Sequence, residues 1–176
     1  MKIRVQITTA ENASFLNCDY NHIIEIEFED YVARVVASEI GNSPIEACKA
    51  QAIAARTFAV GRGVLDGKVI SDSASVAQAF RAVRNNYANC IKAAQETEGL
   101  VLTYNDKIIS AVYSDSNGGR IVSAQEKWGS ARPYLIAKDD PWTAATGAKK
   151  NGHGVGLSQK GAVYAAKNGV GFENIL

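Results

Sequence analysis

The sequence predicts an α+β fold, in which a helix pair packs against a mostly antiparallel sheet. Residues 2–8 and 23–28 alternate apolar and polar side chains, as half-buried strands do. Between residues 28 and 60 the apolar side chains instead recur every three or four positions, which is typical of amphipathic helices. A length of 176 residues is enough for a proper core. We therefore expect residues 1–176 to form a single domain, built as one body or as two small lobes around a cleft.

The composition argues against nucleic acid as a partner and against a membrane-spanning segment. Charged residues make up 21% of the chain, the net charge is +1, and Lys and Arg form no dense run, so nucleic acid is not an expected partner. No apolar run approaches the roughly 20 residues of a membrane span. The chain opens directly on a strand pattern without a signal peptide. This fits either a cytoplasmic protein or a domain separated from its export or anchor segment.

The cysteines and histidines give little support to a metal site. Cys18, Cys48 and Cys90 are far apart and form no C-x-x-C pair, and His22 and His153 are isolated. We therefore expect neither a metal nor a cofactor. Three cysteines allow at most one internal disulfide, and Cys48 is most simply a small core residue.

A carboxylate stands out in the first predicted helix, which begins near Asp30. The apolar stripe of this helix consists of Phe28, Tyr31, Val32, Val35 and Val36. Glu39 lies four residues after Val35 and seven after Val32, so it continues the stripe. A carboxylate there faces the core or the floor of a cleft, where a general acid would act on a bound substrate. The alternative is a solvated or capping carboxylate at a frayed helix end.

The corner after this helix carries several turn signals. Gly41 is suited to the left-handed conformation that ends a helix. Ser43, Pro44 and Glu46 have the spacing of a capping box with proline at the first helical position. The second helix, up to Val60, is rich in alanine, which lets another backbone approach closely.

The remaining elements are predicted less sharply. The expectations are a loop or hairpin over 9–21, a helix within 76–98, a hairpin of 100–104 and 108–114 around Asn105-Asp106, a loop over 115–156, a helix over 158–167 and the start of another from 171. A loop as long and aromatic as 115–156 is typical of a functional segment rather than a linker.

Two further segments contain residues that a plain core does not need. In the segment from Tyr113 to Gly119, small polar side chains and glycines expose backbone N–H groups, which suits binding of hydroxyl or acetamido groups. In the segment from Asn151 to Gln159, glycines on both sides of His153 let a ligand approach the imidazole. A generic turn and a glycine-rich loop with a surface histidine remain the alternatives.

The sequence does not support a serine or cysteine nucleophile, nor a pair of catalytic carboxylates. The sequence has no G-x-S-x-G motif, and Cys48 has no histidine nearby in sequence. A two-carboxylate glycosidase needs a second acid beside Glu39. The available acids are Asp115, Glu126, Asp139 and Asp140, but no spacing pairs any of them with Glu39.

Four blocks in order resemble the SpoIID/LytB family, which comprises peptidoglycan lytic transglycosylases of sporulation and related amidase-enhancer proteins. The blocks are DYVARVVASEIGNSPIEACKAQAIAARTFAV, TEGLVLTYNDKIISAVYSDSNGG, KWGSARPYLIAKDDPW and GHGVGLSQKGAVYAAKNGVGFENIL. The resemblance covers nearly the whole chain from Ile23 onward, and four blocks in the right order are far more specific than any one.

The resemblance implies an α+β fold with an elongated cleft, and cleavage of glycan strands between MurNAc and GlcNAc. Glu39 matches the catalytic glutamate of the family. It would protonate the glycosidic oxygen and then, as a base, help the MurNAc 6-hydroxyl attack the anomeric carbon, leaving a 1,6-anhydro end. The substrate-binding residues expected from the blocks are Gln51, Arg56, Tyr113, Ser114, Ser116, Asn117, Gly118, Gly119, Trp128, His153, Ser158 and Gln159.

The sequence departs from the family pattern at three places. Family members often carry His where Tyr113 stands and Tyr where Lys160 stands. Some carry a Cys/His cluster that binds zinc just after the second helix. The corresponding loop here, SDSASVAQAF, has neither residue type, so we expect no zinc.

The first functional hypothesis is therefore a lytic transglycosylase. It would be extracytoplasmic and associated with the cell wall, with peptidoglycan glycan strands as substrate and a cell-wall amidase or another sporulation or cell-wall protein as a possible partner. The rival is a non-catalytic peptidoglycan-binding module that activates an amidase. A third alternative is a cytoplasmic α+β domain of another role.

Overall fold

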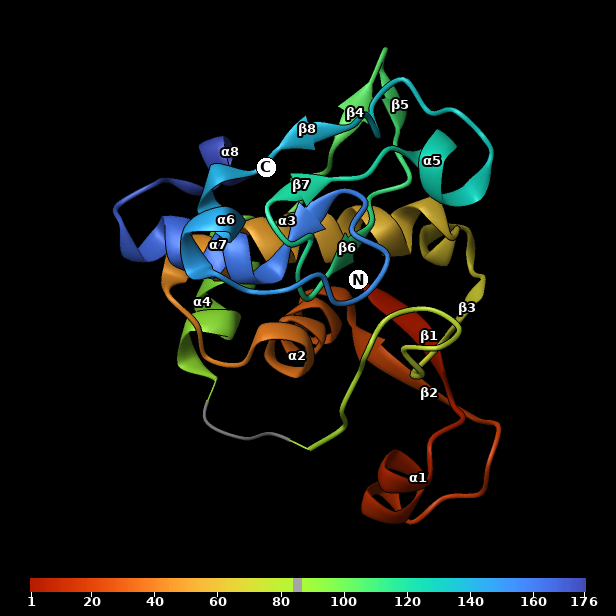
Figure 1. The fold of residues 1–176 in the computed structure, drawn as a ribbon. Helices are drawn as coiled ribbons and strands as arrows, with labels where there is room; N and C mark the ends of the chain where they lie inside the picture. The colour runs from red at the N-terminus through yellow and green to blue at the C-terminus, as the bar shows by residue number, and fades with distance from the viewer. Residues whose placement is uncertain (84–86) are drawn as a thin grey trace.

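The structure is a computed structural model that describes residues 1–83 and 87–176. It confirms the predicted α+β fold, in which helices alternate with short strands (Figure 1). The helices are α1 Ala10–Leu16, α2 Phe28–Ile40, α3 Ile45–Gly61, the 3₁₀ turn η1 Val64–Asp66, α4 Ala88–Glu96, α5 Ala124–Trp128, α6 Pro141–Thr146, α7 Gln159–Lys167 and α8 Phe172–Ile175. The strands are β1 Lys2–Ile7, β2 His22–Glu27, β3 Val69–Ser71, β4 Thr103–Tyr104, β5 Lys107–Ile108, β6 Tyr113–Ser114, β7 Arg120–Ile121, β8 Lys138–Asp139 and β9 Leu157–Ser158.

The strands pair in small sheets rather than in one larger sheet. The three-stranded sheet has the order β2-β1-β3, with β1 antiparallel to β2 and parallel to β3. Ile3, Val5 and Ile7 of β1 face the interior, as their alternation predicts. Among the other pairs, β4/β5 and β7/β8 are antiparallel, whereas β6/β9 is parallel. Most of these pairings are antiparallel, as expected, but the strands form short separate ladders instead of one sheet.

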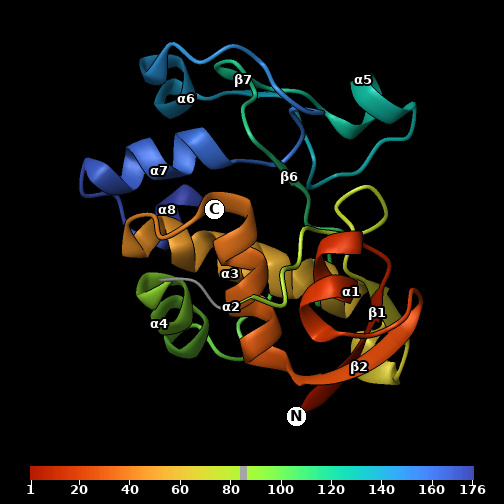
Figure 2. The ribbon, with the colours of Figure 1, turned by 90° about the horizontal axis from the view of Figure 1, so that it is seen from below.

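Helix α3 lies at the centre of the molecule. Helices α2 and α4 pack on it on one side, together with the three-stranded sheet, and α7 and α8 pack against it as well (Figures 1 and 2). Cys48, Ala52, Ala55 and Ala59 of α3 belong to the main core. Small side chains let several elements approach the α3 backbone, as the alanine-rich sequence predicts.

A second, smaller core lies in the region after β5. It consists of Ala124, Leu135 and Val155, with a few partly buried neighbours. The segment 115–156, expected as a loop, contains β7, α5, β8 and α6. The two helices begin at polar caps: Ser123 forms a capping box with Glu126 at the start of α5, and the Asp140 side chain accepts from the Thr143 N–H at the start of α6.

Other expectations have mixed outcomes. The predicted loop or hairpin over 9–21 is wrong, because α1 forms there and buries Asn12 and Ala13. The helix expected within 76–98 is α4, which begins only at Ala88; residues 84–86 of that range lie outside the described residues. The β4/β5 hairpin is confirmed, with positive φ at Asn105 and Asp106 as tight hairpin turns require. Helices α7 and α8 lie where the sequence places them.

The corner between α2 and α3 has glycine where backbone conformation requires it. Gly41 adopts φ 62° and ψ −162°, which glycine reaches at the least cost. The predicted capping box is wrong. The Ser43 hydroxyl instead donates to the Ile40 carbonyl at 2.6 Å, and the Glu46 carboxylate accepts from the Phe172 N–H at 2.9 Å.

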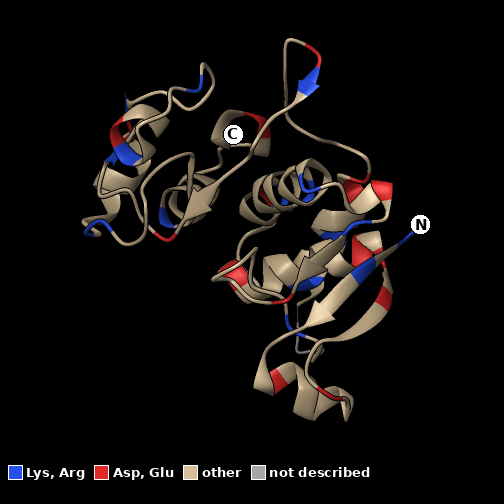
Figure 3. Cartoon of the chain, turned by 90° about the vertical axis from the view of Figure 1, so that its right-hand side faces the viewer, with Lys and Arg blue, Asp and Glu red and all other residues tan. Residues whose placement is uncertain are grey.

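Acidic and basic residues are interspersed over the elements, as Figure 3 shows. Within the described ranges, none of the helices combines the length and the hydropathy that crossing a membrane requires.

Candidate functional site

Glu39 lies in the last turn of α2, where the apolar stripe carries it to the wall of a cavity. Its side chain is partly buried, and its exposed part lines the cavity. The cavity has a volume of about 410 Å³. Its lining comes from the end of α2, the segment after β6 and helices α6 and α7: Glu39, Ile40, Asp115, Thr146, Gln159, Lys160, Val163, Tyr164 and Lys167.

Two donors from distant parts of the chain fix the Glu39 carboxylate. The Ala79 backbone N–H donates to Oε1 at 2.9 Å, and the Gln159 side-chain amide donates to Oε2 at 3.0 Å. Each oxygen therefore keeps one lone pair for another partner. The carboxylate is therefore held in one orientation and can still accept a hydrogen bond from a bound ligand.

A buried hydrogen-bond network lies beside the Glu39 carboxylate. Gln78, the residue before Ala79, donates to the Tyr31 hydroxyl at 3.0 Å and accepts from the Tyr113 hydroxyl at 2.7 Å. Burial raises the pKa of both tyrosines, and the nearby charge of Glu39 raises it further. Both phenols therefore stay protonated around neutral pH and act as hydrogen-bonding groups beside Glu39.

The segment that carries Gln78 and Ala79 is clamped to the start of the chain. Asp72 is 1% exposed and accepts hydrogen bonds from Thr8, Thr9 and Asn12. Asn12 also donates to the Phe80 carbonyl and accepts from the Ala82 N–H. We call residues 72–82 the clamp segment. Burial acts to raise the pKa of Asp72, but the hydrogen bonds from Thr8, Thr9 and Asn12 outweigh it and lower the pKa.

A second carboxylate lines the same cavity. Asp115 accepts from Lys160 at 2.9 Å and from the Asn151 side chain at 2.9 Å. Burial acts to raise the pKa of Asp115, but these hydrogen bonds and the charge of Lys160 outweigh it and lower the pKa. Asp115 is therefore ionised near neutral pH and is unsuited to donating a proton.

Arg56 does not reach the cavity, contrary to its expected role in substrate binding. It is 1% exposed and forms an ion pair with Glu29 at 2.5 Å. Its other donors bind the Ala94 and Leu100 carbonyls and the Thr97 hydroxyl. A buried guanidinium needs such partners, so Arg56 ties α3 to α2 and α4 instead.

The prediction that Gln51 binds substrate is also wrong. Its side chain is 1% exposed, and within residues 1–83 and 87–176 neither amide atom has a hydrogen-bond partner. It lies inside the protein rather than on the cavity wall.

The segment from Ser114 to Gly119 uses its polar groups internally. Ser114 accepts from the Gly154 N–H, and Asn117 donates to Asp140 at 2.7 Å. The N–H groups of Gly118 and Gly119 bind the side chains of Ser116 and Asn117, so they are not free for a ligand as expected.

Ser116 and Ser158 are buried as well. Ser116 exchanges backbone hydrogen bonds with Asn151. Ser158 caps α7 through the Gly161 N–H and accepts from the Thr143 hydroxyl at 2.7 Å. Of the residues expected to bind substrate in these two glycine-rich segments, Gln159 lines the cavity and contacts Glu39.

His153 and Trp128 form a separate aromatic pair. Their ring centroids lie 5.3 Å apart, and Trp128 is 49% exposed. His153 Nδ1 accepts from the Val155 N–H, so a neutral imidazole carries its proton on Nε2. Burial lowers the pKa of His153, and the charges of Lys127 and Lys150 act in the same direction.

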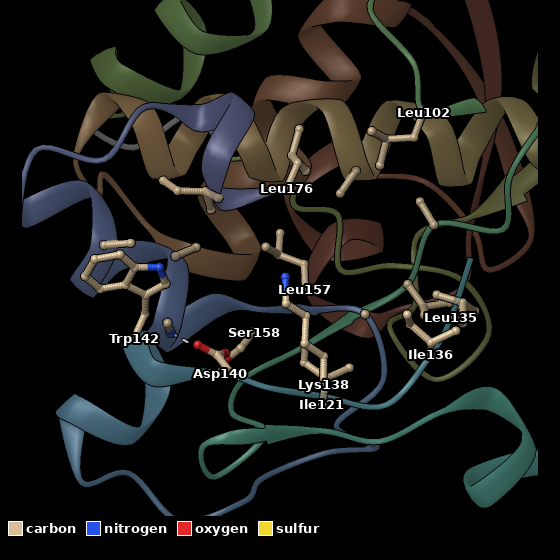
Figure 4. A pocket seen from close by; sticks show the side chains of 18 of the residues that line it. Leu102, Ile121, Leu135, Ile136, Lys138, Asp140, Trp142, Leu157, Ser158 and Leu176 are labelled. Carbon is tan, nitrogen blue, oxygen red and sulfur yellow. Dashed lines mark hydrogen bonds between the residues drawn. The ribbon is translucent and has the colours of Figure 1, made fainter. Parts of the chain in front are cut away.

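A second cavity, of about 400 Å³, lies on the other side of α7. Its lining is mainly apolar, and Figure 4 shows Leu102, Leu135, Trp142, Leu157 and Leu176 around it. Gly161, Ala162 and Ala165 of α7 face this cavity, whereas Lys160, Val163 and Tyr164 face the cavity of Glu39.

Several residues of the site escape sequence reasoning. Gln78 and Ala79 lie in a segment of ordinary loop composition, and a backbone N–H donor leaves no mark in the sequence. Asp115 and Lys160 carry suitable charge, but only the parallel β6/β9 pairing brings them together. Within the described residues, no group of three or more His, Cys, Asp and Glu side chains is arranged to hold a metal ion.

Comparison with known proteins gives consistent matches. Residues 17–104 match the family model described as SpoIID, stage II sporulation protein. The chain is 42% identical over 96 residues to the amidase enhancer of Bacillus subtilis (strain 168), an alignment that covers 54% of this chain and 13% of that protein. It is 36% identical over 144 residues to stage II sporulation protein D of Bacillus amyloliquefaciens and 35% identical over 135 residues to that of Bacillus subtilis.

The last two alignments cover 69% and 66% of this chain, but 41% and 39% of those proteins. The chain thus spans about two fifths or less of the relatives that it matches. The family model spans half of the chain and includes α2, α3 and α4 with Glu39 at the corner. On this match the chain belongs to the SpoIID family.

Proposed function

We propose that this chain is a lytic transglycosylase domain that cleaves peptidoglycan glycan strands between MurNAc and GlcNAc. The observation that carries the proposal is the state of Glu39: a carboxylate on a cavity wall, with each oxygen oriented by one fixed donor. Cavities of this size class commonly bind ligands. We further propose that residues 1–176 act as a single domain.

The chemistry requires one group that serves as acid and then as base. Protonated Glu39 gives its proton to the glycosidic oxygen as the bond to the anomeric carbon breaks. The carboxylate then accepts the proton of the MurNAc 6-hydroxyl as that oxygen attacks the anomeric carbon. The proton returns to Glu39, and the product is a 1,6-anhydro end. The hydrogen bonds from Ala79 and Gln159 would hold the carboxylate in line for both steps.

Asp115 has a different role in this scheme. Its lowered pKa keeps it negative beside Lys160. A fixed negative charge in the cavity would stabilise the positive charge that develops at the anomeric carbon in an oxocarbenium-like transition state. Asp115 would therefore act electrostatically, with no transfer of a proton.

The exposed Trp128 ring, backed by His153, is the proposed contact for a sugar further along the strand. Aromatic faces offer a large apolar area with little loss of side-chain entropy. A glycan substrate also places the working protein outside the cytoplasm, at the cell wall.

A second candidate function has its own support. One relative is named amidase enhancer, which suggests a peptidoglycan-binding module that activates a cell-wall amidase. Under this hypothesis the cavity binds strands without cleaving them.

One experiment separates the two functions. Purified glycan strands are incubated with the protein, the products are analysed by mass spectrometry, and strand binding is measured by cosedimentation. Anhydro-MurNAc ends that accumulate with time support the transglycosylase. Strand binding with no new ends contradicts it and supports the binding module.

A further inference from the structure

Cys48 and Cys90 form a buried pair that the proposed reaction does not use. Cys48 lies in the first turn of α3 and Cys90 near the start of α4, and neither side chain is exposed. The two side chains are neighbours in the main core. Cys18, the third cysteine, is partly exposed and lies after α1. The pair thus brings two thiols from helices 42 residues apart in sequence into contact.

Both thiols converge on the corner that follows Glu39. Cys48 Sγ donates to the Ser43 carbonyl at 3.3 Å, and Cys90 Sγ donates to the Gly41 carbonyl at 3.2 Å. Asn89, next to Cys90, donates its side-chain amide to the same Ser43 carbonyl at 2.9 Å. Its backbone N–H donates to the Asn42 side chain at 2.9 Å. Four hydrogen bonds therefore hold the start of α4, the start of α3 and residues 41–43 together.

We propose that Cys48 and Cys90 are a disulfide-forming site that covalently joins α3 to α4 beneath the corner carrying Glu39. Thiols already in contact need only small side-chain rotations to reach bonding geometry. A domain that works at the cell wall also meets the oxidising conditions in which disulfides persist.

The bond forms by thiol–disulfide exchange with an oxidant that itself contains a disulfide. The thiolate of one cysteine attacks one sulfur of the oxidant and releases its other half as a thiolate. The thiolate of the second cysteine then attacks the first cysteine's sulfur in the mixed disulfide and releases the second half. The protein loses two protons and two electrons, and the oxidant becomes two thiols.

Since both sulfurs are buried, exchange is expected while the chain folds, before α4 covers the corner. Exchange in the folded protein should be far slower.

The test uses the chain with Cys18→Ser, which removes the unpaired thiol. The protein is refolded in buffers with different ratios of oxidised to reduced glutathione, alkylated and digested with trypsin without reduction. We expect the peptide carrying Cys48, which also contains Glu39, to be joined to the peptide carrying Cys90. Folded protein whose two thiols are both alkylated across all ratios would overturn the proposal.

A second measurement compares the stability of the oxidised and reduced forms of the same protein. The urea midpoint of the Cys18→Ser protein is compared before and after dithiothreitol treatment. The oxidised form should have the higher midpoint, because the cross-link restricts the unfolded chain. A lower midpoint for the oxidised form would show that native packing cannot hold the bond and would count against the proposal. The matched control, Cys18→Ser with Cys90→Ala, should show no shift with dithiothreitol.

Discussion

At the scale of single residues, the hydrogen bond from Gln159 to Glu39 joins two segments 120 positions apart. Replacing Gln159 with Leu keeps the approximate size of the side chain but removes the donor. A hydrogen bond to a charged group contributes about 1.5–3 kcal/mol, so glycan cleavage should fall by roughly 10–100-fold. The measurement is the rate at which anhydro ends form.

The control for this variant is Gln95→Leu, at an exposed position of α4. It should cleave at the wild-type rate. Equal rates for Gln159→Leu and wild type would show that orientation of Glu39 by Gln159 is unimportant.

Sequence reasoning predicted the position of Glu39 at a cavity but not the burial of Arg56, for one physical reason. Helical periodicity tells which face of a helix a residue occupies, but not what covers that face. The stripe of α2 places Glu39 at a cavity wall. The face of α3 that carries Arg56 is covered by Glu29 and by the turn after α4, at Thr97 and Leu100, so the guanidinium becomes a structural group.

At the scale of elements, the clamp segment depends on one buried carboxylate. Asp72→Asn keeps the shape of the side chain, but its neutral amide cannot accept from all three donor residues. Unfolding free energy at neutral pH should fall by about 2 kcal/mol. Glycan cleavage should fall too, because the segment carries Ala79, which binds Glu39. The control is Asp66→Asn, at an exposed position of η1.

The stability difference between wild type and Asp72→Asn should depend on pH. The folded-state pKa of Asp72 lies below its ordinary value of 3.8. Its contribution to stability is therefore complete above that value and is lost as pH falls through the folded pKa. Urea midpoints measured over this range should show wild type and Asp72→Asn converging as the pH falls below 3.8. A gap that widens in acid would contradict the role given to Asp72.

Elements whose ends depend on remote partners were the hardest to predict. The Ser43-to-Glu46 spacing is that of a capping box, yet Glu46 binds Phe172, 126 residues away. Likewise α1 was missed because its buried polar residue, Asn12, packs against the distant clamp segment. Local patterns predicted β1, β2, α2, α3, α7 and the β4/β5 hairpin, where a local apolar pattern or turn signal is enough.

At the scale of the whole molecule, the β6/β9 pairing joins the region of the smaller core to α7 and so brings Gln159 to Glu39. Gly156 precedes β9 with φ +70°, and a Cβ there would lie 2.2 Å from the Val112 carbonyl oxygen. Gly156→Ala should lower unfolding free energy by about 1–2 kcal/mol for the backbone conformation and by about a further 1–3 kcal/mol for the clash.

Gly147→Ala separates these two effects. Gly147 has φ +67°, but a Cβ there meets open space. It should therefore show the conformational cost of about 1–2 kcal/mol alone. Equal losses in the two variants, measured by urea unfolding, would show that the β6/β9 region relaxes to admit a side chain.

The most direct test of the account is Glu39→Gln, assayed for anhydro-MurNAc ends by mass spectrometry beside wild type and Glu98→Gln, an exposed control. Gln keeps the size of the side chain but cannot transfer the proton. General acid–base catalysis is worth about 10²–10⁴ in rate, and Glu39 would act in both steps. We predict a loss of at least about 10³-fold for Glu39→Gln, with folding and strand binding retained and Glu98→Gln unaffected. Equal cleavage by Glu39→Gln and wild type would contradict the assignment of Glu39 as the catalytic residue.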